Sequence, residues 1–397
     1  MQITIIYRYF APDTAPFGLL LAEMIPALVA AGHDIEVIAG YPAYGEGVAA
    51  LDPPKRETLF GADVRRMSLP PVRKIPGGGF LDAMLFCLGA AWKVFRGPKR
   101  DVYWMGSTPP VIQPWLVGLA AKLRGGRIVY QIQDIHPEIG LHSGKMKSGI
   151  SSRLLAFFDN RALRRADRVT VLSADMADVI ENRSGVRPAV LNNFALGLPE
   201  TADETTPRRA GPIRFAYAGN IGQFQNLDAV VDAFADVPPD LAELHLLGDG
   251  KAKARLIETV RVRGLKHVHF QDRCSAQEAF AFLRQQDVGV VSLEPGLYRL
   301  AYPTKLHSYF AAGLKVFALL EEESRLAQLI REHQAGDVVS LESSCAVVTK
   351  RIMALATTMR DQKTENQGVP KVLWHRDAAM SRWLDLLDGM QPLETQS

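Results

Sequence analysis

The chain has 397 residues, of which 47% are hydrophobic and 22% charged, so it can bury a large core and is not a disordered protein. At this length we expect two or three domains. The three cysteines are far apart and form no Cys-x-x-Cys pair or Cys/His cluster, which argues against a disulfide scaffold and a zinc module. The first ten residues read as a buried strand rather than a signal peptide, which predicts a cytoplasmic protein.

The positive charge is concentrated in the first half of the chain. The net charge is only +3, but residues 55–100 contain ten Lys and Arg against three acidic residues, and residues 143–168 contain seven against two. This asymmetry indicates an anionic partner: membrane lipid, nucleic acid or a phosphorylated substrate. Nucleic acid is not expected, because the sequence has no helix-turn-helix signature and no basic motif interleaved with aromatic residues.

Short β-branched runs alternate with helix-length amphipathic segments along the first half. We predict strands over residues 3–7, 35–39, 102–104, 127–132 and 168–172, and a first helix over residues 17–31. This alternation is typical of a parallel, doubly wound sheet. Residues 102–121 lack charge over a membrane-spanning length, but three prolines and several polar residues interrupt them. We therefore predict a strand, a loop and a helix there, and no transmembrane helix.

The alternation stops at residues 192–212, which are polar, acidic and rich in Pro, Gly and Thr, as in a linker. It resumes with strands predicted over residues 213–218, 243–247, 268–271, 288–293, 316–320 and 337–340, and a helix over 226–235. Apolar positions within 372–390 predict a helix pair that packs back on the first domain. The division is a first domain of residues 1–191, a linker of 192–212, a second domain of 213–370 and a returning segment of 371–397. The fold class is α/β, with two Rossmann-like, doubly wound parallel sheets that face a cleft.

Two glycine loops follow neighbouring predicted strands of the second domain. Tyr217-Ala-Gly-Asn-Ile-Gly222 joins a strand to a helix, so its backbone amides are expected to be free to bind an anion such as phosphate. A purely structural glycine turn is an equally weighted alternative. Leu247-Gly-Asp-Gly250 ends the next strand, at the edge where doubly wound sheets bind ligands.

A third motif begins a later helix of the same domain. Pro303, Thr304 and Lys305 lie at its start, where the helix dipole disfavours a lysine. An anionic ligand would explain the placement of Lys305. The alternative is a solvated surface lysine.

Taken in order, AGNIGQFQNL, LLGDG and PTKLHSYFAAGLKV resemble the nucleotide-binding half of the GT-B glycosyltransferases of family 4. The first half resembles the same family in YFAPD at 9–13, AGHDIEV at 31–37, STPP at 107–110, QDIHPE at 133–138 and RADRVTVLS at 165–173. The resemblance covers almost the whole chain and is to the transferases of exopolysaccharide, colanic-acid and O-antigen synthesis. Each motif is weak by itself, but the ordered set is specific.

This resemblance implies the transfer of a sugar, with retention at the anomeric carbon, from a nucleotide sugar to a saccharide linked to polyprenyl diphosphate. A UDP-sugar is expected, with a GDP-sugar as the alternative, and no cofactor. The sequence contains no D-x-D, so we expect no metal on the diphosphate, whose charge the loop amides and Lys305 would stabilise.

The resemblance also implies the site residues, in three groups. The catalytic group is Asp134, His136 and Glu138, with a structural loop histidine as the alternative for His136. The nucleotide sugar would contact Gly219, Asn220, Gly222, Gln225, Gly248, Gly250, Arg273, Pro303, Thr304, Lys305 and Ser308. The acceptor side would be formed by Pro12, Asp13 and Gly18.

The sequence departs from the family pattern where the nucleotide is expected to bind. Leu300 and Ser308 replace the two glutamates spaced E-x7-E, Gln223 replaces a basic residue, and Ala15-Pro-Phe-Gly18 replaces the usual glycine pair. Two alternatives stay open: a catalytically silent GT-B protein that binds a nucleotide sugar or a partner transferase, and a UDP-sugar 2-epimerase. The lost glutamates favour the silent protein, whereas the intact loops and Lys305 disfavour it.

The segment from Phe80 to Phe95 is apolar nearly all round, with only Asp82 and Lys93 charged, and it is expected to be too short to span a bilayer. The basic residues that flank it are Arg73, Lys74, Arg96, Lys99 and Arg100. Such flanks attract anionic lipid and let a helix lie at the interface, which predicts a protein peripheral to the cytoplasmic face of the inner membrane. The alternative is a helix buried within the first domain.

Overall fold

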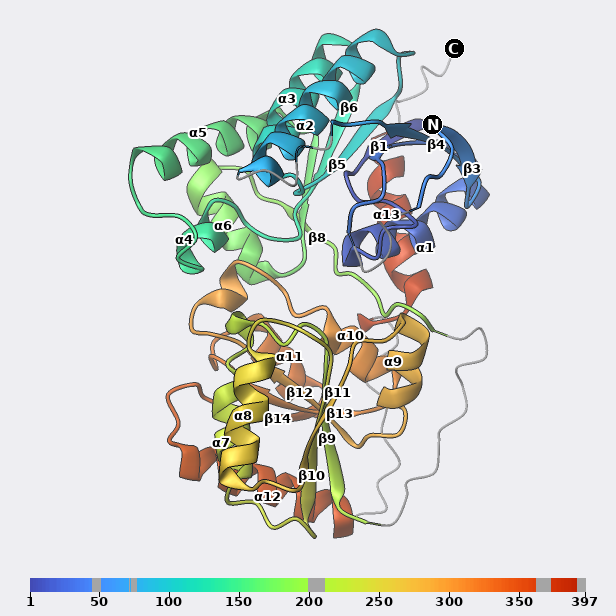
Figure 1. Cartoon of the computed structure of the whole chain (residues 1–397). Helices are drawn as coiled ribbons and strands as arrows, with labels where there is room; N and C mark the ends of the chain where they lie inside the picture. The colour runs from blue at the N-terminus through green and yellow to red at the C-terminus, as the bar shows by residue number, and fades with distance from the viewer. Residues whose placement is uncertain (45–50, 71, 73–76, 199–210, 362–372, 391–397) are drawn as a thin grey trace. The chain divides into compact units, whose positions relative to one another are not determined.

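The computed structural model describes the chain except for residues 45–50, 71, 73–76, 199–210, 362–372 and 391–397 (Figure 1). Two compact units are present. The first comprises Met1–Asn192, Leu300–Tyr302 and Met380–Ser397, and the second comprises Asn193–Arg299 and Pro303–Ala379. Each unit is built on one central sheet, in agreement with the predicted α/β fold class. Most of the predicted linker, residues 199–210, lies outside the described residues.

The sheet of the first unit has eight strands in the order β3-β4-β2-β1-β5-β6-β7-β8. Neighbouring strands are parallel except for the antiparallel pair β3–β4. The strands are β1 (Gln2–Ile6), β2 (Asp34–Gly40), β3 (Arg56–Leu59), β4 (Ala62–Met67), β5 (Val102–Gly106), β6 (Arg127–Gln131), β7 (Arg168–Val171) and β8 (Ala189–Val190). The helices between them are α1 (Pro16–Ala30), α2 (Gly78–Arg96), α3 (Ile112–Leu123), α4 (Glu138–His142), α5 (Ile150–Arg165) and α6 (Ala174–Ser184). Strand order reverses between β1 and β5, so the loops after these strands open at a ligand-binding position of α/β folds.

The hairpin β3–β4 is absent from the sequence-based expectations. Its two-residue turn consists of Phe60 and Gly61, whose φ angles are 56° and 86°. Phenylalanine is uncommon in this left-handed region, where Asn-Gly or Asp-Gly is the usual hairpin signal. The ring of Phe60 packs edge-on against Phe10 at a centroid distance of 6.2 Å, which gives this unusual turn residue a packing role.

The sheet of the second unit has six parallel strands in the order β11-β10-β9-β12-β13-β14. Counted along the chain from β9, this is the order 3-2-1-4-5-6 of the Rossmann fold. The strands are β9 (Ile213–Ala218), β10 (Ala242–Leu247), β11 (Val268–Gln271), β12 (Val288–Ser292), β13 (Lys315–Leu319) and β14 (Gly336–Val339). The helices are α7 (Leu227–Phe234), α8 (Lys253–Arg263), α9 (Ala276–Leu283), α10 (Lys305–Ala311), α11 (Arg325–Glu332) and α12 (Cys345–Asp361).

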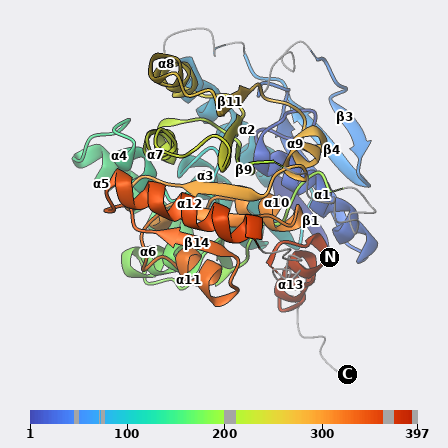
Figure 2. The same ribbon diagram turned by 90° about the horizontal axis from the view of Figure 1, so that it is seen from below.

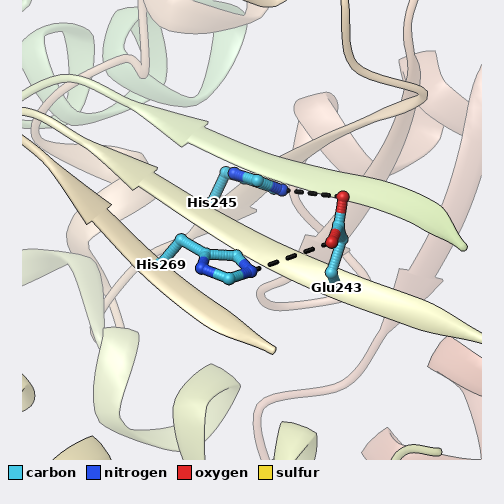
Figure 3. A group of neighbouring side chains, drawn as sticks. All are labelled: Glu243, His245 and His269. Atoms are coloured by element: carbon cyan, nitrogen blue, oxygen red, sulfur yellow. Dashed lines mark ion pairs between the residues drawn. The ribbon is translucent and has the colours of Figure 1, made fainter. Parts of the chain in front are cut away.

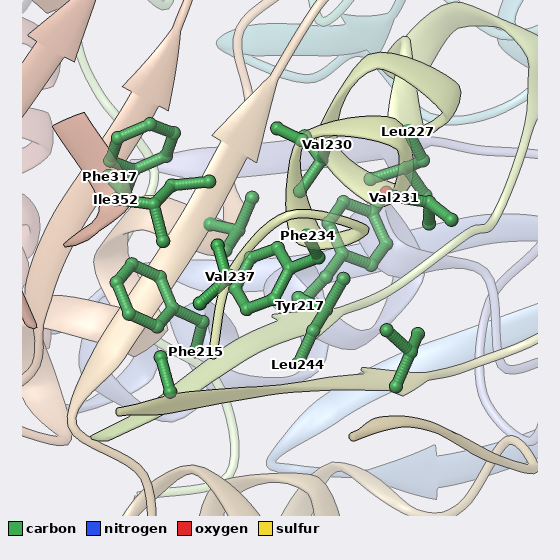
Figure 4. Close-up of a cluster of buried hydrophobic side chains, with 14 of the residues drawn as sticks. Phe215, Tyr217, Leu227, Val230, Val231, Phe234, Val237, Leu244, Phe317 and Ile352 are labelled. Carbon is green, nitrogen blue, oxygen red and sulfur yellow. The ribbon is translucent and has the colours of Figure 1, made fainter. Parts of the chain in front are cut away.

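A hydrophobic core joins the second sheet to its helices (Figure 4). Phe215 of β9 contacts Phe234 of α7 and Phe317 of β13, with ring centroids 5.5 and 6.1 Å apart. Helix α12 contributes Ile352 and packs against α7, β9 and β14 (Figures 1 and 2). This core fixes β9, and with it the glycine loop that follows its last residue.

The last described helix, α13 (Arg376–Asp388), returns to the first unit, as predicted. Trp383 is fully buried and stacks on Trp104 of β5 at a ring-centroid distance of 4.3 Å. Trp104 also donates a hydrogen bond from Nε1 to the side-chain oxygen of Gln131, at 3.0 Å. The expected helix pair is only partly seen, because residues 362–372 lie outside the described residues and α13 is the one helix described after them.

Helix α2 is longer than the sequence predicts. By length and composition alone its 19 residues could cross a membrane, although 33% of its most apolar window is buried in the first unit. They extend over about 28 Å, close to a hydrocarbon thickness of about 30 Å. Asp82 on this helix forms a buried ion pair with Arg8 at 3.2 Å, and separating such a pair is strongly destabilising. We conclude that α2 packs as part of the first unit.

Candidate active site

The first glycine loop and Lys305 follow two neighbouring strands of the second sheet. β9 ends at Ala218 and leads directly into the loop, and β12 leads through the short helix η4 (Leu297–Arg299) to α10. These two strands pair in parallel at the position where the strand order reverses. Their carboxyl ends lie at the edge of the sheet where α/β proteins bind ligands.

The two glycine loops pack closely on each other. Gly219, Gly248 and Gly250 have φ angles of 141°, 142° and 154°, which side-chain-bearing residues rarely adopt. A Cβ on Gly248 would lie 1.9 Å from the carbonyl oxygen of Gly219, and one on Gly250 would lie 2.3 Å from that of Ile221. The contact between the loops therefore requires these glycines whether or not a ligand is bound.

Most amides of the first loop are not free, contrary to the prediction. The N–H groups of Gly219 and Ile221 donate to carbonyl oxygens of residues 247 and 249, at 2.9 and 2.8 Å. The N–H group of Gly222 donates to the side chain of Gln225 at 3.0 Å. Among the four loop amides, that of Asn220 is left without an acceptor in the part of the chain that the structure describes. An anion at this loop would depend on one amide and the neighbouring lysine.

Lys305 brings its amine to this loop. Its Nζ donates to the hydroxyl group of Tyr217 at 2.6 Å and lies 3.8 Å from the centre of that ring. A Cβ on Gly219 would lie 4.0 Å from the same nitrogen. Burial lowers the pKa of Lys305 to about 7, and no carboxylate among the described residues pairs with it. A desolvated amine without a counter-ion is a candidate position for an anionic ligand.

Tyr309 fixes the helix that carries Lys305. Its buried ring lies over Gly289 of β12, where a Cβ would be 2.3 Å from the ring. Its hydroxyl group accepts from the N–H of Ala218 and donates to the carbonyl oxygen of Val290, both at 3.1 Å. Because Tyr309 lies one turn after Lys305, these bonds tie the start of α10 to the ends of β9 and β12.

The other residues expected to contact the nucleotide sugar differ in their surroundings. Gln225 lies in the short helix η3 (Gln223–Gln225) and holds the first loop, and Pro303 is buried just before α10. Thr304 is exposed beside α10, and Ser308 is half-buried within it. Arg273 is exposed and lies two residues after Gln271 of β11, whose carbonyl oxygen accepts a hydrogen bond from the amide of Gly248.

Two of the three predicted catalytic residues lie in the loop after β6. Burial raises the pKa of Asp134 to about 6, and its carboxyl group has no hydrogen bond or ion pair with the described residues. Burial, and then the charges of Arg183 and Lys145, lower the pKa of His136 to about 4, so its imidazole is neutral at pH 7. A carboxyl group that ionises near pH 6 is suited to accept a proton from a hydroxyl group.

Glu138, the third predicted catalytic residue, is held in an ion pair. Arg183 of α6 binds its carboxylate at 2.7 and 2.9 Å and the carbonyl oxygen of His136 at 2.7 Å, and also binds Asp159 of α5. Asp159 in turn accepts a hydrogen bond from Tyr130 at 3.0 Å. These contacts give Glu138 a positioning role. Sequence reasoning missed the other three members, because they come from three separate elements and no motif links them.

The predicted acceptor-side residues lie in the loop after β1 and in α1. Asp13 accepts two hydrogen bonds at Oδ1 from the amides of residues 43 and 44, while its buried Oδ2 has no partner among the described residues. Burial raises the pKa of Asp13. Pro12 is exposed, whereas Gly18 is buried. A Cβ on Gly18 would lie 2.2 Å from the carbonyl oxygen of Tyr9, so no side chain fits at this position. Gly18 therefore has a packing role at the start of α1, and its contact with the acceptor stays a prediction.

Leu300, which replaces the first glutamate of the family pattern, has a packing role. It lies with Tyr302 against the core of the first unit. Its carbonyl oxygen accepts from the N–H of Ile135 at 2.9 Å, and the next residue, Ala301, forms a β-bridge with Asp134. The position that carries a glutamate in the family pattern therefore supports the Asp134 loop here.

Comparison with known proteins agrees with the fold described above. Residues 20–193 match the model of the glycosyl transferase 4-like domain. WcaI of Escherichia coli (strain K12), named for glycosyl transfer in colanic acid biosynthesis, is 26% identical over 356 residues, which cover 83% of this chain and 86% of WcaI.

Two solved structures show the same fold over nearly all of the chain. Sucrose-phosphate synthase from Thermosynechococcus elongatus aligns with a TM-score of 0.73 and 16% identity, over 98% of this chain and 99% of that chain. Anabaena HepE in complex with UDP aligns with a TM-score of 0.65 and 14% identity, over 98% and 100%. The domain match over the first unit, the relative and the shared fold all agree with the predicted resemblance to the family 4 glycosyltransferases with the GT-B fold.

Proposed function

We propose that the protein transfers a sugar from a UDP-sugar to a saccharide linked to polyprenyl diphosphate, with retention at the anomeric carbon and without a divalent metal on the diphosphate. The name of WcaI supports a role in cell-surface polysaccharide biosynthesis, and the UDP bound to HepE supports UDP as the nucleotide. Retention and the lipid-linked acceptor rest on the family resemblance of the motifs.

The observation that carries this proposal is the unpaired amine of Lys305 beside Gly219. A diphosphate at this edge of the sheet would supply the missing counter-charge. As the bond between the anomeric carbon and the diphosphate oxygen breaks, negative charge grows on that oxygen, and a fixed cation stabilises it. Lys305 would thus bind the diphosphate of the nucleotide sugar and also stabilise the nucleoside diphosphate as it leaves.

In the first unit, Asp134 is the residue suited to take the proton of the attacking hydroxyl group. Above pH 6 its carboxylate is ionised and unpaired, so it can accept this proton as the hydroxyl oxygen bonds to the anomeric carbon. Retention requires that this bond form on the face from which the diphosphate departs. His136, neutral at pH 7, can donate or accept a hydrogen bond to a sugar hydroxyl without adding charge. The pair of Glu138 and Arg183 holds this loop in place.

The experiment that tests this function is a screen of nucleotide sugars by thermal shift, followed by transfer to a lipid-linked acceptor with NMR assignment of the new linkage. We expect UDP-sugars to raise Tm, the product to retain the anomeric configuration, and excess EDTA to leave the rate unchanged. Binding without transfer would instead identify a silent GT-B protein. Conversion of the UDP-sugar in the absence of an acceptor would identify a 2-epimerase.

We also propose that the first unit docks on anionic membrane through what we call the apolar face. This face comprises the exposed apolar side chains of three helices, of which α3 packs against both α2 and α5 (Figure 1). Its members are Phe80, Leu81, Leu88, Trp92 and Phe95 on α2, Leu119 and Leu123 on α3, and Ile150, Leu154 and Phe157 on α5. So much exposed apolar surface is typical of an interaction site.

Cations accompany the apolar face. The guanidinium of Arg96 lies 4.6 Å from the ring centre of Trp92, and that of Arg161 lies 5.4 Å from the ring centre of Phe157. Pairs of a long cation and an aromatic ring suit the boundary between lipid headgroups and acyl chains. This combination favours an anionic lipid surface over an uncharged partner.

One residue of the predicted basic flanks, Arg100, is not available to lipid. Arg100 is buried and pairs with Asp34 at 2.6 Å, so its expected role at the membrane is wrong. Arg73 and Lys74 lie outside the described residues. Lys93, Arg96 and Lys99 are the exposed cations at the end of α2.

A fourfold variant tests the docking. Replacing Trp92 and Phe95 by serine, and Lys93 and Arg96 by glutamine, should release the protein from vesicles of phosphatidylcholine and phosphatidylglycerol. The variant loses apolar burial, at about 25 cal/mol per Å², and attraction of about 1 kcal/mol for each cation near the surface. Vesicle flotation at low salt measures the bound fraction.

The matched control changes an exposed apolar residue and a cation on α8 of the second unit. Val262→Ser with Arg261→Gln should float as the wild type does, because neither residue belongs to the apolar face. Wild-type protein that stays in the soluble fraction at low salt would contradict the docking. Equal release of the control would show that bulk charge, rather than this face, governs the association.

A further inference from the structure

Three metal-ligating side chains converge on the second sheet (Figure 3). Glu243 and His245 lie two residues apart on β10 and therefore on one face of the strand. His269 of β11 is the direct register partner of His245. Glu243 Oε1 lies 3.0 Å from His245 Nε2, and Oε2 lies 3.7 Å from His269 Nε2. One ligating atom from each residue lies within 4.8 Å of the others.

His245 supports a ligand at this position. Its side chain is mostly buried, Nδ1 has no hydrogen-bond partner among the described residues, and Nε2 has a carboxylate oxygen of Glu243 as its partner, 3.0 Å away. Burial leaves Nδ1 without the hydrogen bond that water supplies, which is costly. With Nε2 already directed at the Glu243 carboxylate and the second imidazole beside it, a cation between the two Nε2 atoms and the carboxylate would be bound by all three groups.

We propose that Glu243, His245 and His269 bind one divalent transition-metal ion of the Zn²⁺, Co²⁺ or Ni²⁺ class. Two imidazole nitrogens and one carboxylate oxygen suit these ions, whereas Mg²⁺ and Ca²⁺ prefer oxygen ligands. The ligands are already close, so small side-chain rotations would bring them to coordination distance. Three protein ligands leave at least one coordination position for water.

Arg214 of β9 sets both the precision and the strength of this site. Its Nε donates to Glu243 Oε1 at 2.8 Å, which fixes the carboxylate as outer hydrogen bonds do in metal sites. Its positive charge also opposes the incoming ion. We therefore expect a site whose carboxylate ligand is held in a fixed orientation, and whose affinity for the ion is lower than that of a site surrounded by anionic groups alone.

The ion would connect the edge strand of the sheet to its neighbour. β11 is the terminal strand and pairs with β10 alone. Its last residue, Gln271, accepts a hydrogen bond from the amide of Gly248 at 3.1 Å. A metal bridge between His245 and His269 would therefore stabilise the strand pair that carries the second glycine loop.

The test is titration of tag-free, chelator-treated full-length protein with Co²⁺ and Zn²⁺. Visible absorption of bound Co²⁺ reports nitrogen coordination, and calorimetry with Zn²⁺ gives the affinity and the stoichiometry. We expect one ion for each chain. His269→Ala and His245→Ala should each weaken binding at least about 10-fold, since loss of even an outer partner of a metal site weakens binding 10- to 100-fold. Saturating Zn²⁺ should raise the Tm of the wild type and not that of the variants.

His333→Ala is the matched control, because His333 is a half-buried histidine of the same unit outside the cluster. It should bind metal as the wild type does. His269 is partly exposed, with 43% of its side chain accessible, so its replacement should leave the fold intact, and circular dichroism checks this. Absence of saturable binding, or equal binding by the wild type and His269→Ala, would overturn the proposal and identify the cluster as an ion-pair network. Neither result bears on sugar transfer.

Discussion

Replacing Asp134 by asparagine is expected to lower kcat about 10²- to 10⁴-fold, the range attributed to a positioned general base. Because asparagine keeps the shape of the side chain, the fold should be unchanged. Because its amide cannot accept the proton, the rate should fall. Transfer of a radiolabelled sugar measures the effect. Asp178→Asn, on an exposed carboxylate of α6, should retain wild-type activity. Activity within a few-fold of the wild type would remove Asp134 from the catalytic step.

The pH profile gives this prediction a second measurement. Because the ionised carboxylate is the active form and its pKa is about 6, kcat/KM should fall as the pH drops below 6. Lys305 must be charged to hold the diphosphate, and its pKa is about 7, so kcat/KM should also fall as the pH rises above 7. The profile is therefore a narrow bell, and Asp134→Asn should lack its acidic limb. His136, with a pKa of about 4, adds no limb between pH 5 and 8.

Replacing Lys305 by alanine is expected to weaken UDP binding by about 1.5–3 kcal/mol, the range for hydrogen bonds to charged groups, or roughly 10- to 150-fold. Isothermal titration calorimetry measures the loss directly. It should also detect a proton. Bound diphosphate raises the pKa of Lys305 from its value near 7, so wild-type protein at pH 8 should take up protons on binding, and its apparent enthalpy should depend on the buffer.

The matched control is Lys315→Ala. Lys315 is a second lysine of the same unit whose pKa burial lowers, but it begins β13 and thus lies at the opposite edge of the sheet. Its replacement should leave UDP affinity unchanged. Lys305→Arg should retain part of the affinity and lose the proton uptake, because arginine is charged at every accessible pH. Unaltered affinity in Lys305→Ala would contradict the assignment of the diphosphate to this edge.

The sheets could be predicted from sequence because parallel strands buried on both faces are continuous β-branched runs with a helix between them. β1, β6 and β9 all lie within one or two residues of the predicted ranges. The hairpin β3–β4 could not be predicted in this way, since one of its turn residues is Phe60.

The candidate site could be predicted only in part. Lys305 and Gly219 belong to local motifs, and the order of the strands then brings them together. The hydrogen bonding of the loop amides could not be predicted, because the acceptors for Gly219 and Ile221 belong to residues 247 and 249, about 28 residues further along the chain. Arg183 could not be found either, since its carboxylate partners, Glu138 and Asp159, become neighbours only when α5 and α6 fold against the β6 loop.

The stacking of Trp383 on Trp104 has a consequence for the order of events during synthesis. The first unit is discontinuous in sequence, and its last helix is translated about 190 residues after Asn192. At about 5–20 residues per second, a ribosome needs roughly 10–40 s to cover that distance. During this interval Trp104 of β5 lacks the ring of Trp383 that covers it in the folded protein, so the nascent first unit exposes an apolar surface that chaperones or the membrane surface can bind. The first unit is therefore the first to be translated in part and the last to be translated in full.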